Sequence, residues 1–136
     1  MESRVEQAIE RHKKGYNCSQ AVACTYCDLF GIDEETMFRV TEGLGAGMGN
    51  MDGTCGAVSG ACVLAGLKGS TAHLTKPDSK GTSYKYSREI MARFKSINTT
   101  TRCKELKGFD TGVVIRKCPD CVRDAATIAE TVLFED

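Results

Sequence analysis

Residues Gly43–Leu67 read GLGAGMGNMDGTCGAVSGACVLAGL, and this stretch decides the fold of the chain. Its first half is predicted to be a loop, because the alternating glycines offer left-handed backbone conformations and no side-chain cover for a helix. Its second half, about Thr54–Leu67, is predicted to be a helix that is small and apolar on nearly every side. We expect this helix to be central, since small residues let neighbouring backbones approach closely. Cys55 lies at the junction of loop and helix.

Amphipathic helices are predicted on both sides of this stretch. The segments with helical spacing are 3–14, 18–30, 33 to the loop, 54–67, 78 or 79 to 98, 102–107, and a last one near Pro119. Tyr86, Ile90, Phe94 and Ile97 form the apolar stripe of the fifth helix. Only 109–117 has strand-like content, and it is short. The pattern predicts an all-α protein, a compact bundle of about five to seven helices in one domain over 1–136, around the Gly/Ala-rich helix.

Composition excludes several classes of function. Basic and acidic residues balance at eighteen each, so nothing steers the chain toward nucleic acid or a membrane surface. No apolar run reaches the roughly 18 residues of a spanning helix, so membrane insertion is not expected. The N-terminus is charged and amphipathic rather than a signal peptide. We therefore expect a cytoplasmic protein, and the sequence leaves a homo-oligomer open.

Eight cysteines are unusual for a cytoplasmic chain. In a reducing compartment, many cysteines indicate metal binding or redox chemistry more often than a disulfide framework. The only two histidines, His12 and His73, lack metal-ligand spacing, and we interpret them as surface or core residues. A metal site would therefore depend on thiolates.

Four of the cysteines share a position that helical periodicity does not require. Cys18, Cys55, Cys103 and Cys118 each fall at or just before the first turn of a predicted helix. Free amides and partial positive charge at a helix start favour the thiolate, the form that attacks disulfides and binds metals. If these starts converge, they form either two redox-active pairs or one four-thiolate cage. The alternative is that each cysteine is a small buried hydrophobe.

Cys118-Pro119-Asp120-Cys121 is the strongest local motif. Cys-x-x-Cys at a helix start keeps one thiol exposed and the second one turn away, which suits disulfide exchange with Cys118 and Cys121 as the catalytic pair. The same spacing is also compatible with half of a zinc or iron–sulfur site. Cys24 and Cys27 repeat the spacing inside a helix, where core packing is the better interpretation, and Cys62 is interpreted as core too.

The glycine-rich loop does not have the spacing of a nucleotide-binding motif. We expect its glycines to bring backbone amides close to the site, where the amides could donate to a thiolate, a cluster or a small ligand. Gly47 and Gly49 in the loop and Gly56 after the junction are the predicted cofactor-binding positions.

Four segments together resemble the C_GCAxxG_C_C family of redox-active proteins. They are Asn17-Cys18-Ser19-Gln20-Ala21, Gly47-Met48-Gly49 followed by Cys55-Gly56-Ala57-Val58-Ser59-Gly60, Cys103-Lys104-Glu105-Leu106, and Cys118-Pro119. The resemblance implies that Cys18, Cys55, Cys103 and Cys118 are the family's cysteines. It also implies that the other four are additions in this chain, and its name records a presumption of redox activity rather than a reaction.

Three hypotheses follow. The preferred one is a redox-active protein in which Cys18, Cys55, Cys103 and Cys118 bind an iron–sulfur cluster or zinc, because four separate helix starts suit a cage better than one exposed dithiol. It leaves an oxidoreductase and an electron carrier open. The second is metal-free thiol–disulfide exchange with an unknown redox partner protein. The third is a non-catalytic helical interaction module, which predicts thiols in unconnected parts of the core.

Overall fold

The computed structural model describes residues 1–135, and within them the chain folds into helices with no strand. The helices are α1 (Val5–Lys13), α2 (Cys18–Tyr26), α3 (Glu34–Glu42), α4 (Gly45–Met48), α5 (Gly56–Gly69), α6 (Lys80–Asn98), α7 (Cys103–Lys107) and α8 (Cys118–Ala129). A 3-10 turn, Cys27–Phe30, extends α2, and a π-helical turn, Glu130–Phe134, extends α8. The predicted all-α class is confirmed. Along residues 1–135, no helix combines the length and apolar character needed to cross a membrane.

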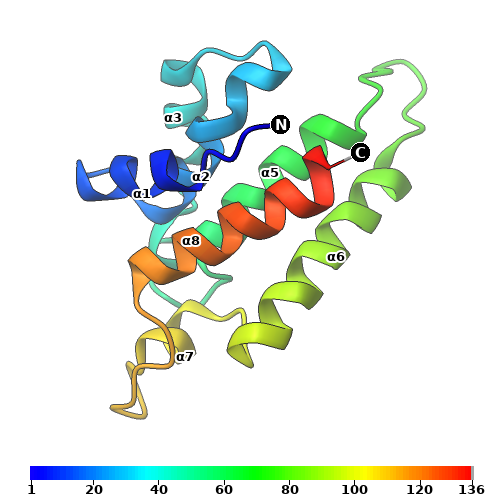
Figure 1. Ribbon diagram of the computed structural model, residues 1–136. Helices are drawn as coiled ribbons and strands as arrows, with labels where there is room; N and C mark the ends of the chain where they lie inside the picture. Colours follow the sequence, from blue (N-terminus) through cyan, green and yellow to red (C-terminus); the bar gives the residue numbers. More distant parts are fainter. Residues whose placement is uncertain (136) are drawn as a thin grey trace.

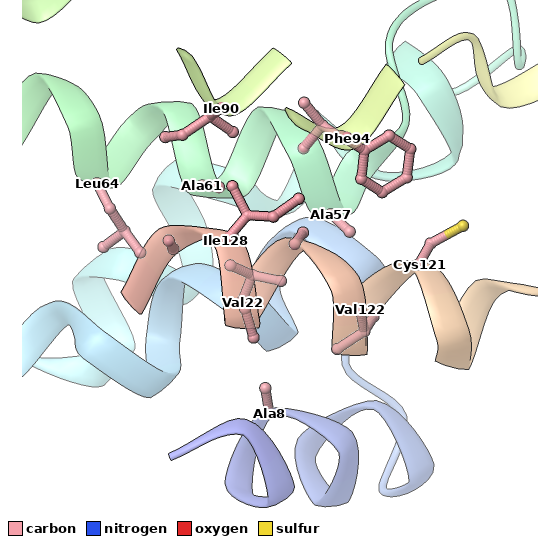
Figure 2. Packing of buried hydrophobic residues seen from close by; sticks show 14 of the residues in the cluster. Ala8, Val22, Ala57, Ala61, Leu64, Ile90, Phe94, Cys121, Val122 and Ile128 are labelled. Carbon is pink, nitrogen blue, oxygen red and sulfur yellow. The ribbon is translucent and has the colours of Figure 1, made fainter. Parts of the chain in front are cut away.

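Helix α5 lies at the centre of the fold, as the sequence predicts. It packs against α2, α6 and α8, and α8 runs beside it across the middle of the molecule (Figure 1). Ala57, Ala61 and Leu64 on α5 are fully buried. Figure 2 shows them between α6, which contributes Ile90 and Phe94, and the apolar side chains of α8 and α2. A helix that is apolar on nearly all sides can therefore bury each side against a different neighbour.

Glycines on α5 set how closely α2 approaches. A Cβ at Gly60 would lie 2.6 Å from the backbone oxygen of Ser19, whereas a Cβ at Gly66 would meet nothing within 4 Å. Gly60→Ala is expected to lower the free energy of unfolding by about 1–3 kcal/mol, because α2 must move away. Gly66→Ala is the matched control, and it should raise that free energy by about 0.5–1 kcal/mol. Chemical denaturation of both variants measures the difference, and equal effects would contradict the close approach.

The structure differs from the predicted elements in three places. The loop 43–53 contains the short helix α4, in which Ala46 and Gly47 have left-handed backbones with φ of 53° and 58°. Residues 109–117 form turns, because the amides of Ile115 and Arg116 donate to the Leu106 carbonyl and fold this segment back onto α7. Ile97 is 59% exposed, because Asn98 takes the inward position after Phe94.

Candidate functional site

The starts of four helices meet at one cavity of about 170 Å³. Helices α2, α7 and α8 begin at a cysteine, and Cys55 is the residue before α5. The cavity is lined by five cysteines, Cys18, Cys55, Cys103, Cys118 and Cys121. The structure therefore brings together all four of the cysteines that the sequence places at helix starts, and it adds Cys121.

The start of α2 is fixed by a capping box. The Asn17 side chain accepts a hydrogen bond from the Gln20 amide at 2.9 Å, and the Gln20 side chain accepts one from the Asn17 amide at 3.0 Å. This reciprocal pair satisfies two amides that a helix start leaves free, so Cys18 must be the first helical residue. A Cβ on Gly45 would lie 2.4 Å from Asn17 Nδ2, so only glycine lets α4 approach this cap.

The starts of α5 and α7 are tied to each other through the backbone. The Cys55 amide donates to the Thr101 carbonyl at 2.7 Å, and the Cys103 amide donates to the Gly53 carbonyl at 3.0 Å. These two bonds form an isolated antiparallel β-bridge, in which Thr54 lies opposite Arg102. Cys55 and Cys103 thereby reach the same cavity from segments that are far apart in the sequence.

The three glycines predicted to bind a cofactor lie in different places. Gly56 lines the cavity, and a Cβ there would lie 3.4 Å from the Cβ of Cys18. Gly47 packs against Cys103, where a Cβ would come within 2.5 Å of the Cys103 Cβ. Gly49 has nothing within 4 Å of its Cβ position, and it ends α4 with a φ of 84°. Close approach accounts for Gly47 and Gly56, whereas Gly49 serves the turn.

Cys18 and Cys118 form the more accessible thiol pair, and both are half-buried. The hydrogen bond from the Cys18 thiol lowers the pKa of Cys118 to about 5, with help from the Lys107 ammonium and against the effect of burial. The same hydrogen bond raises the pKa of Cys18, and burial raises it further. The two shifts describe one proton shared by two sulfurs. Because Lys107 bonds to Cys118, we assign the negative charge to Cys118 and the proton to Cys18.

Cys55 and Cys121 form a second pair, which is 5% and 3% exposed. The pKa of Cys55 is lowered by the hydrogen bond from the Cys121 thiol and by the first-turn amides of Ala57 and Val58, although burial opposes this. The pKa of Cys121 is raised by the same hydrogen bond and by burial. We call Cys18 and Cys118 the outer pair, and Cys55 and Cys121 the inner pair. Cys103, the fifth cysteine, has a pKa raised by burial and held back by Lys107.

Lys107 and His12 belong to the site, and the sequence analysis did not identify either as functional. Lys107 ends α7 and lines the cavity, where its own pKa is raised by the nearby Cys118 and Cys103 sulfurs against the effect of burial. His12, in the last turn of α1, lies with its Nε2 3.7 Å from the Sγ of Cys18. A cation for the thiolate and a base for the remaining thiol are thus both present.

The other cysteines lie away from the cavity lining. Cys24 and Cys27 are each 2% exposed and pack in a separate small cluster with Ala23 and Met37. Burial, the largest effect, raises the pKa of Cys24 to about 12, so this thiol stays protonated. Cys62 is half-buried and packs against the main core. These positions agree with the core interpretation of all three.

A four-thiolate cage does not match the arrangement of the cysteines. Among residues 1–135, no group of three or more Cys, His, Asp or Glu side chains is placed to hold a metal ion. All eight cysteines are free thiols, and four of the five at the cavity interact in two pairs, which leaves Cys103 in neither. A tetrahedral site needs four sulfurs around one point about 2.3 Å away. The residues present, as arranged here, do not fit an iron–sulfur cluster or zinc.

Fold and site together define a helical protein in which five cysteines line one cavity. The pKa is lowered at two helix-start cysteines, Cys55 and Cys118, whereas burial helps to raise it at the other two, Cys18 and Cys103, where the expected thiolate is not favoured. The chain belongs to the C_GCAxxG_C_C family, because the family model described as "Putative redox-active protein (C_GCAxxG_C_C)" matches residues 16–132. None of the curated proteins and none of the solved structures in the comparison matches the chain. Membership confirms the resemblance found in the sequence and supports redox activity.

The low pKa of Cys118 makes its reactivity depend on pH in a specific way. Because the thiolate is the reactive form, the rate of alkylation of Cys118 should rise as pH increases through about 5 and then level off, whereas a thiol with the ordinary value of 9.0 would still gain reactivity above neutral pH. Lys107→Met should move the midpoint upward by about one pH unit, since it removes the neighbouring cation. Mass spectrometry after brief alkylation reports each cysteine separately.

Lys104→Met is the matched control for this titration. Lys104 lies on the same helix as Lys107 but contacts Asp52 and Asp110, at 3.4 and 3.7 Å, rather than the cavity. Its replacement should leave the midpoint of Cys118 unchanged. A midpoint near 9 in the unaltered protein would contradict the assignment of Cys118 as the thiolate.

Proposed function

We propose that this protein is a thiol-based redox protein that exchanges electrons with disulfides through Cys118 and Cys18. One observation carries the proposal. Cys118 is a half-buried cysteine at the start of α8, and its thiolate is stabilised by the Cys18 thiol and by Lys107. A thiolate that is accessible, stable at neutral pH and adjacent to a second thiol has the properties of an attacking cysteine with its resolving partner.

The exchange proceeds in two balanced steps. The Cys118 thiolate attacks one sulfur of the partner's disulfide, and the partner's other sulfur leaves as a thiolate that takes up a proton. His12 then accepts the proton of Cys18, and the Cys18 thiolate attacks the Cys118 sulfur. The bond to the partner breaks, and the departing thiolate takes the proton from His12. The partner is reduced by two electrons, and Cys18 and Cys118 are oxidised to a disulfide. A dithiol reductant reverses these steps and regenerates the protein.

The Cys-x-x-Cys motif suggests Cys121 as the resolving cysteine, but Cys18 suits this role better. Cys18 has the largest effect on the pKa of Cys118, whereas the pKa of Cys121 responds most to Cys55. His12 lies beside Cys18 and supplies the base that the second step requires. The non-catalytic interaction module has less support, because it predicts thiols in unconnected parts of the core.

An iron–sulfur cluster or zinc on Cys18, Cys55, Cys103 and Cys118 is the alternative form of redox function. It would require the two pairs to separate and four sulfurs to converge, so we rank it second. Anaerobic purification followed by iron, sulfide and zinc analysis tests both forms at once. We expect metal-free protein that reduces a small disulfide in a stoichiometric reaction. Stoichiometric iron and sulfide with a visible charge-transfer band would overturn the metal-free proposal.

The partner in this proposal is a protein that carries a disulfide. The loop between α7 and α8 exposes apolar side chains: Phe109 at 62%, Val113 at 67%, Val114 at 54% and Ile115 at 45%. The loop leads directly into Arg116, which lines the cavity, so a polypeptide bound to it would lie beside Cys118. An exposed apolar cluster of this kind is typical of an interaction surface. We place the encounter in the cytoplasm, where thiols are kept reduced.

Val113→Asp tests the loop as the docking surface. The variant should reduce a protein disulfide about tenfold more slowly, as loss of a buried apolar contact costs roughly 1–2 kcal/mol, and should reduce a small disulfide at the unaltered rate. Sedimentation of the unaltered protein measures its oligomeric state, and so tests whether the loop binds a second copy of this chain instead of a partner protein. A homodimer that Val113→Asp dissociates would assign the loop to self-association instead.

A further inference from the structure

The proposed exchange leaves the inner pair without a role. Cys55 and Cys121 line the same cavity as the outer pair, yet they are only 5% and 3% exposed. A protein partner cannot bring its disulfide to sulfurs that are this deeply buried. The disulfide of a protein partner must therefore act on the inner pair through the outer pair, which forms the more accessible part of the same cavity.

The two pairs are connected at both ends. Cys118 and Cys121 are three residues apart on α8, a spacing that places their side chains on the same helix face about 5–6 Å apart at Cβ. On the other side, Gly56 follows Cys55, and its Cβ position lies 3.4 Å from the Cβ of Cys18. Glycine at position 56 thus lets the start of α5 rest directly on the start of α2. Cys118 therefore lies beside the inner cysteine Cys121 on α8. Cys18 lies beside Gly56, the residue that follows the inner cysteine Cys55.

We infer that the inner pair withdraws the disulfide from the outer pair by internal exchange, so that the protein passes oxidation from its surface to a buried dithiol. This inference rests on the proposed function, because the outer disulfide must form first. The Cys-x-x-Cys motif then has a distinct role, since Cys118–Cys121 is the intermediate bond between the two pairs. The outer pair is returned to its reduced state and can react with a second disulfide.

The transfer consists of two exchanges that conserve electrons. The Cys121 thiol passes its proton to the neighbouring Cys55 thiolate, and the Cys121 thiolate so formed attacks the Cys118 sulfur of the outer disulfide. The Cys118–Cys121 bond forms, and Cys18 leaves as a thiolate. Cys55 then loses the proton to Cys18, and the Cys55 thiolate attacks the Cys121 sulfur, releasing Cys118 as a thiolate. One disulfide has moved inward, and no electron has left the protein.

Placement favours the inner pair as the final location of the disulfide. The thiolate released in the last step is Cys118, whose pKa is lowered to about 5, and a thiol of low pKa is the better leaving group, so the exchange runs toward the inner pair. Burial then keeps external thiols away from the product, because exchange requires direct attack on a sulfur. The outer disulfide remains exposed to attack by Cys121 and by outside reductants alike.

Time-resolved disulfide mapping tests the inference. Fully reduced protein is mixed with a stoichiometric amount of hydroxyethyl disulfide, quenched with acid at increasing times, alkylated and mapped by mass spectrometry. We expect Cys18–Cys118 first, followed by its replacement with Cys55–Cys121 as Cys18 and Cys118 become alkylatable again. In Cys121→Ser, the outer disulfide should persist, and circular dichroism checks that this variant folds. Cys55→Ser is the second variant, and it should stop the transfer at Cys118–Cys121.

Each outcome has a distinct meaning. An outer disulfide that forms and never moves inward would overturn the relay and leave the proposed function intact. An inner disulfide that forms equally fast in Cys118→Ser would also overturn the relay, because it would show direct access to the inner pair. Failure of Cys18–Cys118 to form at any time in the Cys121→Ser variant would instead contradict the proposed function.

Discussion

Replacing Cys118 by serine is expected to abolish disulfide exchange. The hydroxyl keeps nearly the volume of the thiol but is not ionised at neutral pH, so the attacking group is lost while the packing around α8 is kept. The rate should fall by at least on the order of a thousandfold, as it does when enzymes with covalent catalysis lose their nucleophile. The measurement is the rate at which reduced protein cleaves a chromogenic small disulfide at neutral pH.

Cys62→Ser is the matched control for this loss. Cys62 is also a half-buried cysteine, but it lies on α5 outside the cavity lining and its pKa is raised by burial. Its replacement should leave the rate within about twofold of the unaltered protein, because a protonated thiol contributes little to exchange. Comparable losses in the two variants would indicate that general destabilisation, rather than a specific nucleophile, controls the reaction.

Replacing Cys18 by serine in a protein that also carries Cys121→Ser is expected to trap the reaction halfway, because Cys121 would otherwise attack the Cys118 sulfur in place of Cys18. Cys118 can still attack a disulfide, but the thiol that releases the partner is gone, so the mixed disulfide should accumulate. A covalent complex should appear on non-reducing electrophoresis, disappear on reduction, and map to Cys118. Loss of the hydrogen bond from Cys18 should also raise the pKa of Cys118, so the first step will be slower than in the unaltered protein.

Cys103→Ser distinguishes a resolving role from simple proximity. Cys103 lines the same cavity and starts α7. Burial is the main cause of its raised pKa, and no hydrogen bond to Cys118 contributes to that shift. This variant should complete the exchange without a trapped complex. If Cys103→Ser accumulates the mixed disulfide and the protein with both Cys18→Ser and Cys121→Ser does not, Cys103 is the resolving cysteine and the assignment of pairs must be changed.

The helix starts could be predicted because their signals are local in sequence. Asn17 and Gln20 form the capping box that places Cys18 first in α2, and Pro119 occupies the first turn of α8. Glycine-rich sequence before Cys55 stops the chain from extending a helix backwards. The shared placement of the four cysteines at helix starts therefore follows from short-range rules, and the structure confirms it.

The pairing of the cysteines could not be predicted, because it depends on which helix starts face each other. Sequence spacing favoured Cys118 with Cys121, one turn apart on a single helix. In the fold, the pKa of each responds most to a cysteine at the start of another helix, Cys18 for Cys118 and Cys55 for Cys121. Such contacts span about a hundred and about sixty-five residues of sequence, and no local pattern encodes them.

Lys107 and His12 were missed for the same physical reason. A lysine at the last position of a helix is adequately explained by the helix dipole, and a histidine on an amphipathic helix is most often a surface or core residue. Only the packing of α7 and α1 around the cavity brings the Lys107 ammonium to Cys118 and the His12 imidazole to Cys18. Their chemistry emerges from tertiary structure alone.

Disulfide mapping of the Cys121→Ser variant isolates the exchange between Cys18 and Cys118, because the inner pair cannot then accept the bond. Metal-free, fully reduced protein is oxidised with a stoichiometric amount of a small disulfide, alkylated and digested. We expect a single intramolecular disulfide that joins Cys18 to Cys118, and recovery of the other cysteines as alkylated thiols, namely Cys24, Cys27, Cys55, Cys62 and Cys103. Recovery of Cys18 and Cys118 as free thiols, with the disulfide formed elsewhere or not at all, would contradict it.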